Sequence, residues 1–249
     1  MQYGICHLSL VPLRSEPSEI SEMRNQLLYG EHFTVLEQKA NWFKIKLFPD
    51  NSEGWIDQKQ FREIREEDLQ KYDPKMPFFS ADLIEFISDE KDILMPIPLG
   101  SVLNFIPYFN HKFEGNRQSG KNPKSDLVQT AFLFLNAPFL WGGKSPFGID
   151  SSGLCQMVYR LNGYDIERHS TQQAALGEAL SFIEESEPGD LAFFDDQEGN
   201  INHVGIMMSD NYIIHAYGKV RIDRIDHSGI FNTELGKHTH QLRVIKKII

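Results

Sequence analysis

Cysteine is scarce in this 249-residue sequence, which contains only Cys6 and Cys155, far apart in the chain. Two such thiols argue against the disulfide-stabilised scaffold of small secreted domains, and they exclude a structural zinc site built from several cysteines. The N-terminus also lacks a basic segment followed by a sustained apolar run, and no window approaches the roughly 18 apolar residues of a membrane span. We therefore expect a cytoplasmic protein with no membrane partner.

Basic residues are outnumbered by acidic ones, 25 against 35, which gives a formal net charge of −10 at pH 7. No block rich in lysine or arginine interrupts this balance. Proteins that bind nucleic acid present a basic surface to the phosphate backbone, so nucleic acid is not expected as a partner. The acidic balance indicates a solvated, soluble surface.

The first part of the chain alternates short β-type segments with turns. The segments VPLR, HFTVLEQ, WFKIKLF and EGWIDQ are rich in β-branched and aromatic residues, and SEPSE, YGE and FPDNSEG separate them. About five short strands in about 60 residues are typical of a small barrel, which we place at residues 1–62. Residues 63–115 have looser β character in ADLIEF, KDILMPI and SVLNFIPYF, with prolines that limit regular pairing. We expect a second, degenerate SH3-like or β-rich segment there.

The polar, glycine-rich stretch HKFEGNRQSGKNPKSD predicts a domain boundary. Beyond it, SDLVQTAFLFLN predicts a helix capped by Ser125 or Asp126, and further helices are expected from Ser152 to about Leu161 and over TQQAALGEAL. The periodicity then becomes that of strands in GDLAFFDD, INHVGIMM, NYIIHAYG, KVRIDRID and HTHQLRVIKKI. Helices followed by an antiparallel sheet predict an α+β domain over residues 116–249.

Three features of this domain fit covalent acyl transfer. Asp150-Ser151-Ser152 opens a predicted helix, whose unpaired N–H groups and positive dipole end stabilise a thiolate or an oxyanion. His203 and His215 lie 12 residues apart on successive predicted strands, so the two imidazoles can face each other across a hairpin. Such chemistry requires a nucleophile, a base and a residue that orients the base. Histidines on strands are more often packed or exposed than catalytic, so the spacing alone only points toward a site.

The order of these motifs closely resembles the NlpC-type family of papain-like bacterial cell-wall peptidases. The resemblance rests on PFLWGGKSPFGIDSSGLCQMVYRLNGY, GDLAFFDD, INHVGI and IIHAYGKVRID, while PLRSEPSEISEMRNQLLYGE and EGWID resemble the bacterial SH3-like barrel that precedes such domains. It implies cleavage of the bond between γ-D-glutamate and a diamino acid in peptidoglycan stem peptides that have a free N-terminal L-alanine. It also implies that His203 is the general base and that His215 orients it.

Ser151 stands where the family carries the cysteine nucleophile of an Asp-Cys-Ser-Gly motif. Cysteine chemistry of this kind uses a thiolate paired with imidazolium, and a serine hydroxyl does not ionise in that way. Serine reacts only if His203 removes its proton during the attack, so we expect most or all peptidase activity to be lost. Cys155, one helical turn further on, is expected to point into the core as a small hydrophobe.

Several substrate-binding positions implied by the resemblance are retained. Asp150 and Ser152 flank the nucleophile position, and Ser170 follows in ERHSTQQ. Glu22 matches an acidic position that relatives use near the substrate amine. Trp141 lies next to the expected site and is a candidate for its wall.

Other pocket positions are changed. Phe139 stands where relatives carry a tyrosine, His169 where they carry an acidic residue, and Ser52 where the barrel usually has a tyrosine. Loss of an acidic group and of a tyrosine weakens capture of a free α-amine, because a buried cation needs paired acceptors. We expect the groove to lie between the helix of Ser151 and the sheet of the two histidines, with the first barrel as one wall.

No cofactor or metal is expected. His238 and His240 place two imidazoles on one face of a strand, but a third ligand is missing, so a solvated strand edge is the preferred interpretation.

Three functions remain open. The first is a muropeptide peptidase that acts on recycled wall fragments, with reduced or no activity. The second is a non-catalytic module that binds or senses a peptide, and the third, less favoured, is an acyltransferase on the same scaffold. An engineered trap would explain Ser151 but not Phe139, His169 and Ser52 together, so we favour a divergent natural member. The sequence leaves the oligomeric state open.

Overall fold

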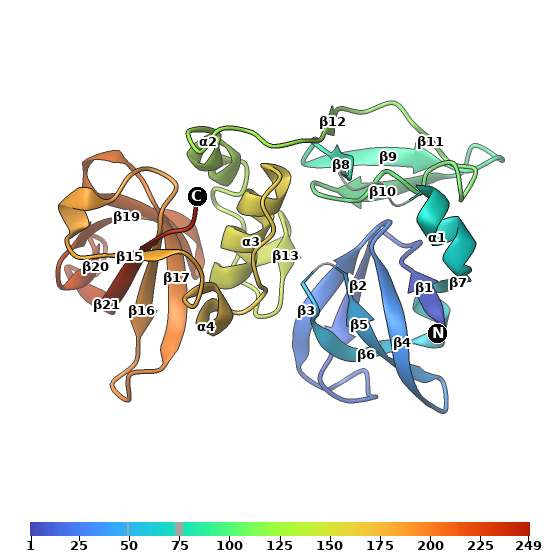
Figure 1. Cartoon of the computed structure of the whole chain (residues 1–249), viewed down its shortest axis with the longest axis horizontal. Helices are drawn as coiled ribbons and strands as arrows, with labels where there is room; N and C mark the ends of the chain where they lie inside the picture. The colour runs from blue at the N-terminus through green and yellow to red at the C-terminus, as the bar shows by residue number, and fades with distance from the viewer. Residues whose placement is uncertain (49, 73–76) are drawn as a thin grey trace. The chain divides into compact units, whose positions relative to one another are not determined.

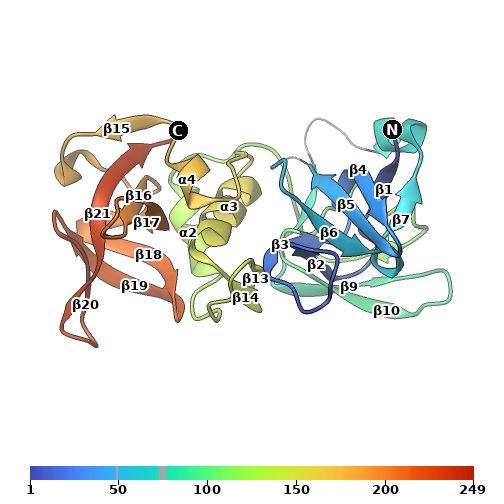
Figure 2. The same cartoon turned by 90° about the horizontal axis from the view of Figure 1, so that it is seen from below.

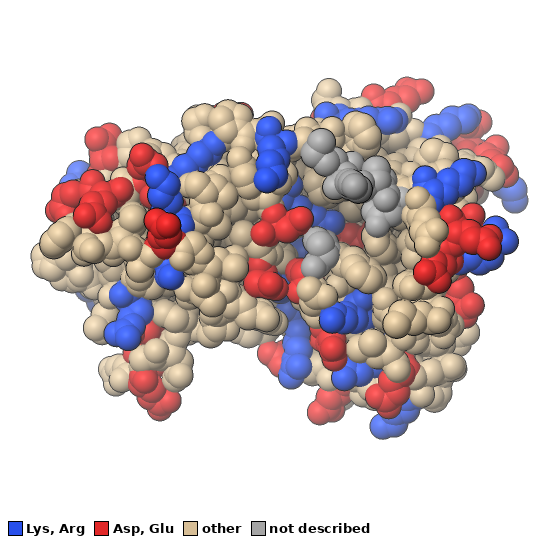
Figure 3. Space-filling view, in the orientation of Figure 1, with Lys and Arg blue, Asp and Glu red and all other residues tan. Residues whose placement is uncertain are grey.

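The computed structural model describes residues 1–48, 50–72 and 77–249. Within these ranges no helix has both the length and the apolar character needed to span a bilayer. On the face of the molecule shown in Figure 3, lysine and arginine side chains are interspersed with acidic ones.

The chain folds into two compact units (Figure 1). The first unit comprises Met1–Gly120 and the short segment Trp141–Pro146, and the second comprises Lys121–Leu140 and Phe147–Ile249. The chain therefore enters the second unit, leaves it for the segment 141–146, and returns. Residues 63–115 lie in the same compact unit as residues 1–62, while the division into three domains remains a prediction.

The first unit is built on a seven-stranded antiparallel sheet with the order β3-β2-β6-β5-β4-β1-β7. In the segment WFKIKL, Phe43, Ile45 and Leu47 are buried and alternate with half-buried residues, which is the two-residue period of a strand with one face on a core. The predicted β-type segments all fall on strands, which confirms an SH3-like β-rich domain at the N-terminus. The strands are β1 (Tyr3–Ile5), β2 (Leu10–Arg14), β3 (Met23–Leu28), β4 (His32–Lys39), β5 (Trp42–Leu47), β6 (Glu53–Asp57) and β7 (Arg62–Ile64).

The remainder of the first unit contains two small sheets. The predicted strands ADLIEF and KDILMPI form the pair β9–β10, but SVLNFIPYF does not form a strand. It turns instead, through bonds such as Ile106 N–H to Leu103 O and Phe109 N–H to Phe105 O, and Pro107 offers no N–H to a ladder. These elements are η1 (Gln58–Gln60), α1 (Glu66–Tyr72), β8 (Phe79–Ser80), β9 (Ile84–Ser88), β10 (Leu94–Pro98), β11 (Lys112–Phe113), β12 (Arg117–Gln118) and, in the segment 141–146, β13 (Lys144–Ser145).

The second unit has a seven-stranded sheet with the order β15-β21-β16-β17-β18-β19-β20, and helices lie to one side of it (Figures 1 and 2). Strand β20 also pairs with β21. This arrangement confirms the predicted α+β domain. Its elements are α2 (Asp126–Phe132), β14 (Gly148–Ile149), α3 (Ser151–Leu161), α4 (Ser170–Gln173), β15 (Glu178–Leu180), η2 (Ile183–Glu185), β16 (Leu191–Asp195), β17 (Ile201–Met207), η3 (Ser209–Asn211), β18 (Tyr212–Tyr217), β19 (Lys219–Asp226), β20 (Gly229–Asn232) and β21 (Lys237–Lys247).

One helix prediction needs correction, and one predicted cap is in place without a capping hydrogen bond. The helix over TQQAALGEAL covers only its first residues, because α4 ends at Gln173 and Glu178–Leu180 pairs with β21 as a strand. Gly177 lies between them with φ of +61°, and a side chain there would collide with the Lys247 carbonyl. Ser125 occupies the N-cap position of α2, but its hydroxyl bonds the Asp126 carboxylate instead of a backbone N–H.

Helix α3 is the element that positions the candidate site. It is buried along its whole length and packs against β17 and β18, the strands that carry His203 and His215. A helix that is buried on all sides is fixed in position by its surroundings. Its first residue therefore has a defined place relative to the sheet.

Candidate active site

The N-terminal end of α3 presents Ser151 as its first residue. Asp150 is the N-cap, in extended conformation, and its carboxylate accepts a hydrogen bond of 2.7 Å from the Gly153 N–H. The helix therefore begins where the sequence predicts, within one residue. Ser151 is 7% exposed, at the end of the helix where the positive dipole stabilises a developing negative charge.

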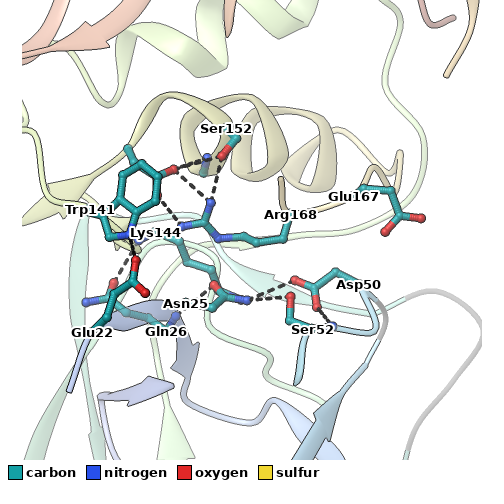
Figure 4. Close-up of polar contacts among 12 residues, drawn as sticks. Glu22, Asn25, Gln26, Asp50, Ser52, Trp141, Lys144, Ser152, Glu167 and Arg168 are labelled. Carbon is teal, nitrogen blue, oxygen red and sulfur yellow. Dashed lines mark hydrogen bonds and ion pairs between the residues drawn. The ribbon is translucent and has the colours of Figure 1, made fainter. Parts of the chain in front are cut away.

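Arg168 fixes this helix start and was missed by sequence reasoning. Its guanidinium, fully buried, donates to both carboxylate oxygens of Asp150, with Nη1–Oδ1 at 2.9 Å and Nη2–Oδ2 at 2.7 Å. Nη1 also donates to the Ser152 hydroxyl at 3.0 Å (Figure 4). Both predicted binding residues next to Ser151 are thus held by one arginine. The only signal in the sequence was its place in ERHS, directly before His169 and Ser170.

The predicted facing of His203 and His215 is present, and it is part of a longer chain of hydrogen bonds. His203 Nε2 lies 2.8 Å from His215 Nδ1, and His215 Nε2 lies 3.1 Å from Asp223 Oδ2. Arg221 donates to both oxygens of Asp223, at 2.7 and 3.0 Å. Sequence reasoning missed Asp223 and Arg221, although the alternation in KVRIDRID places both on the same face of β19.

Burial sets the charge states of this chain. The pKa of His203 lies well below its usual value, because the ring is buried and faces His215 and His240. Burial also lowers the pKa of His215, against the opposing effect of Asp223. For Asp223, burial alone would raise the pKa, but hydrogen bonds from His215 and Arg221 outweigh it and lower it. At neutral pH the hydrogen-bonded series therefore contains two neutral imidazoles, His203 and His215, and one carboxylate, Asp223.

His240 covers one face of the candidate base. Its ring stacks on that of His203, with 4.1 Å between centroids, and burial lowers its pKa to about 4. His238 is exposed and bonds Asp226 at 2.9 Å. The predicted solvated edge therefore describes His238 but is wrong for His240. Across residues 1–48, 50–72 and 77–249 no group of three or more potential metal ligands is found.

The other predicted positions of the second unit lie near these elements. Phe139 forms an isolated bridge with Ile149, directly before the N-cap of α3, and its N–H donates to Gly218 O at 3.0 Å. Ser170 is the first residue of α4 and the exposed His169 is its N-cap residue. Cys155 is fully buried and burial raises the pKa of its thiol, as expected for a core residue.

The predicted positions of the first unit form separate polar contacts. Trp141 Nε1 donates to Glu22 Oε1 at 2.8 Å (Figure 4). Ser52 accepts a hydrogen bond of 3.2 Å from the Asn25 amide. The Glu22 carboxylate is therefore oriented by the indole of Trp141, a residue that belongs to the same unit.

Comparison with known proteins gives two family matches. Residues 136–239 match the NlpC/P60 family, and residues 13–61 match the bacterial dipeptidyl-peptidase SH3 domain. A gamma-D-glutamyl-L-lysine dipeptidyl-peptidase of Bacillus subtilis is 28% identical over 218 residues, which cover 78% of this chain and 72% of that protein. Dipeptidyl-peptidase 6 of Lysinibacillus sphaericus is 38% identical over 93 residues, 37% of this chain and 32% of that protein.

A solved structure shares the fold. An NlpC/P60 family protein from Bacillus cereus superimposes with a TM-score of 0.81 at 19% identity, over 99% of both chains. The two family matches, the shared fold and the resemblance of the motifs agree. The chain combines a bacterial dipeptidyl-peptidase SH3 domain with a domain of the NlpC/P60 family of papain-like cysteine peptidases.

Proposed function

We propose that this protein binds peptidoglycan-derived peptides of the L-Ala-γ-D-Glu-diamino acid type and hydrolyses the γ-D-glutamyl bond slowly or not at all. The observation that carries the proposal is the buried pair His203–His215 on the strands against which α3 packs, with Ser151 as the first residue of that helix. In this proposal His203 serves as the base, His215 orients it, and the nucleophile position holds an oxygen. Recycled wall fragments in the cytoplasm remain the predicted setting.

The reaction open to this site is acyl transfer to serine. Ser151 Oγ would attack the γ-carbonyl carbon of D-glutamate while its proton passes to His203, and the helix start would stabilise the oxyanion. Collapse would expel the amine of the diamino acid, which takes the proton from His203. Water would then hydrolyse the ester, with His203 again accepting the proton.

Two features make this route slow. A serine hydroxyl does not ionise near neutral pH, so no thiolate forms to stabilise an imidazolium. The buried His203, with its lowered pKa, is also a weak acceptor for the serine proton, since base catalysis weakens as the pKa of the base falls. A thiolate at the position of residue 151 would place a negative charge beside His203 and so favour its protonated form.

The test compares this protein with its Ser151→Cys and Ser151→Ala variants on L-Ala-γ-D-Glu-L-Lys, with products followed by mass spectrometry. We expect Ser151→Cys to raise turnover on the order of 100-fold or more. Ser151→Ala should bind the peptide as the parent does, measured by calorimetry. If no variant either binds or cuts the peptide, the proposal is wrong.

A non-catalytic peptide-binding role is the second candidate. It is favoured by the changed positions Phe139, His169 and Ser52, which replace groups that the resemblance assigns to capture of the substrate amine. This candidate predicts that the parent binds a stem peptide with a blocked N-terminus at least as tightly as the free one. A preference for the free amine would favour the peptidase instead.

A further inference from the structure

The chain His203–His215–Asp223 determines where the ring protons are. Asp223 is 3% exposed and receives two hydrogen bonds from the Arg221 guanidinium, which has no acceptor capacity. A carboxylate held in this way is ionised and only accepts hydrogen bonds. The His215 nitrogen that faces it, Nε2 at 3.1 Å, must therefore be the protonated one.

The same reasoning extends one ring further. A neutral imidazole has one N–H and one lone pair, so a His215 protonated at Nε2 presents a lone pair at Nδ1. His203 Nε2 lies 2.8 Å from this atom and must donate to it. His203 then carries its proton on Nε2, and its Nδ1 is left as the basic nitrogen.

The other groups around His203 do not compete for its protons. His240 meets it face to face, with the rings stacked at 27° and 4.1 Å between centroids, and Phe194 meets it as a tilted ring. Glu234 bonds Arg221 at 3.0 Å, so it supports the guanidinium and not the histidines. The carboxylate of Asp223 is thus the acceptor at the end of this chain.

We infer that Asp223 is a positioning residue, which acts through His215 to keep the proton of His203 on Nε2 and leave Nδ1 free to accept the proton of the nucleophile. The effect on turnover rests on the proposed function, whereas the proton positions do not. A positioning role of this kind differs from a packing role because it depends on the acceptor character of the residue and not on its volume.

The proton positions can be read directly by ¹⁵N NMR of the ring nitrogens in the full-length chain labelled at histidine. The resonances of His203 and His215 are assigned because each set of signals disappears from the spectrum of the corresponding variant, His203→Gln or His215→Gln. We expect protonated Nε2 and unprotonated Nδ1 in both rings at pH 7. If His203 of the wild-type protein carries its proton on Nδ1, the inference is wrong. This test needs no variant of Asp223.

Asp223→Leu supplies the second test. Asp223 Oδ2 accepts from both His215 Nε2 and Arg221 Nε, so an asparagine could keep an oxygen toward His215, whereas leucine removes the acceptor at similar volume. Neither ring is then held in one tautomer, and Nδ1 of His203 becomes protonated in part of the molecules. We expect the ¹⁵N shifts of both rings to move toward the average of the two tautomers and, in the Ser151→Cys background, kcat to fall by about 10-fold or more, within the loss of about 10⁴-fold that a fixed wrong tautomer causes.

The matched control is Asp226→Leu on the same strand, since Asp226 bonds the exposed His238 and is not part of the hydrogen-bonded series His203–His215–Asp223. It should change neither the pattern of His203 nor kcat. An Asp223→Leu protein with an unchanged ring pattern would refute the inference, even if activity fell. If Ser151→Cys proves inactive, the proposed function fails and the NMR result still decides the tautomers.

Discussion

In the proposed mechanism, Ser151 and His203 together define the charge state of the site. In a cysteine enzyme the thiolate compensates the charge of the imidazolium, so burial of the base is tolerated. With serine the same buried histidine has no such counter-charge, and its pKa stays low. Under the proposed function, the residue that performs the attack thus also influences how basic its partner is.

The pKa of His203 is therefore expected to rise in the Ser151→Cys variant. The thiolate would favour the protonated ring by charge attraction and so oppose the effect of burial. NMR titration of the ring between pH 4 and 8 measures the change, with Ser151→Ala as the control that removes the hydroxyl without adding charge. An equal pKa in all three proteins would contradict this account.

Loss of Arg168 is expected to destabilise the second unit strongly. Arg168→Met leaves the buried Asp150 carboxylate without its guanidinium, which typically costs about 3–5 kcal/mol of unfolding free energy. Urea unfolding of the full chain gives the value. Arg224→Met, an exposed arginine on β19, is the control and should change stability by less than about 0.5 kcal/mol.

Protonation of the buried histidines is expected to lower stability in mild acid. The folded pKa values of His203, His215 and His240 lie below the value of about 6.5 expected in the unfolded chain. The unfolded state therefore binds more protons as pH falls below 6.5, and unfolding becomes easier by up to about 1.4 kcal/mol per pH unit for each histidine.

The variant His240→Phe isolates one of these contributions. It keeps an aromatic ring against His203 but removes one titrating group, so stability should fall less steeply between pH 6.5 and about 4 than in the parent. Urea unfolding at several pH values measures the slope. An unchanged slope would mean that His240 does not titrate differently on folding.

At the scale of elements, strand β17 carries a glycine where the site needs close approach. Gly205 is paired with His215 across β17 and β18, and a methyl group there would lie 2.9 Å from His215 Cβ and 2.7 Å from Ile213 Cδ1. These distances are too short for carbon atoms, so the strands would have to separate. The contact between the two imidazoles depends on this spacing.

Gly205→Ala is thus expected to cost about 1–3 kcal/mol of stability, as overpacking does, and to weaken the hydrogen bond of His203 to His215. Thermal unfolding and the ring ¹⁵N shifts are the measurements. Gly199→Asn is the control, because it lies in open space in a turn whose positive φ asparagine tolerates. If the two variants have equal stability and equal ring ¹⁵N shifts, Gly205 is not required for the hydrogen bond between His203 and His215.

Patterns within single elements were sufficient to predict most of the sheet, and they failed where another element decided the outcome. INHVGIMM and NYIIHAYG alternate as strands and form them. TQQAALGEAL is rich in helix-forming residues, but pairing of its last residues with β21 prevailed. Strand β20 was missed, since GIFN is too short to show a period.

The same limit applies to the site. His203 and His215 were predictable because a hairpin of this length brings them together. Arg168 and Asp223 were not, because a charged residue gives no sign in the sequence of which buried partner it will meet. The position of Ser151 at the helix start followed from local capping signals, which are readable without tertiary information.

At the scale of the whole molecule, the segment 141–146 makes the first unit discontinuous. Lys144 in this segment is fully buried and bonds the buried carboxylate of Glu31 at 2.8 Å, and its N–H donates to Gln26 Oε1 at 2.8 Å. Both partners belong to the first unit. Completing that unit therefore requires residues that follow it by more than twenty positions in sequence.

A fragment of residues 1–120 is expected to be unstable for this reason. It retains Glu31 in a buried position but lacks the Lys144 ammonium, a loss typically worth about 3–5 kcal/mol. Glu31→Gln should stabilise the fragment yet destabilise the full chain, because only the full chain supplies the positive charge. Urea unfolding of the four proteins tests this reversal, and the same sign in both backgrounds would contradict it.

The discontinuity bears on how such proteins can be recombined. A chimera made by a single crossover at residue 120 would join a barrel carrying Glu31 to a foreign partner without Lys144, and so would exchange half of an ion pair. An exchange that keeps the ion pair has to move the segment 141–146 together with the first unit or replace both charges at once. We therefore expect this unit to be transferable only with a piece of sequence that lies inside the span of the other unit.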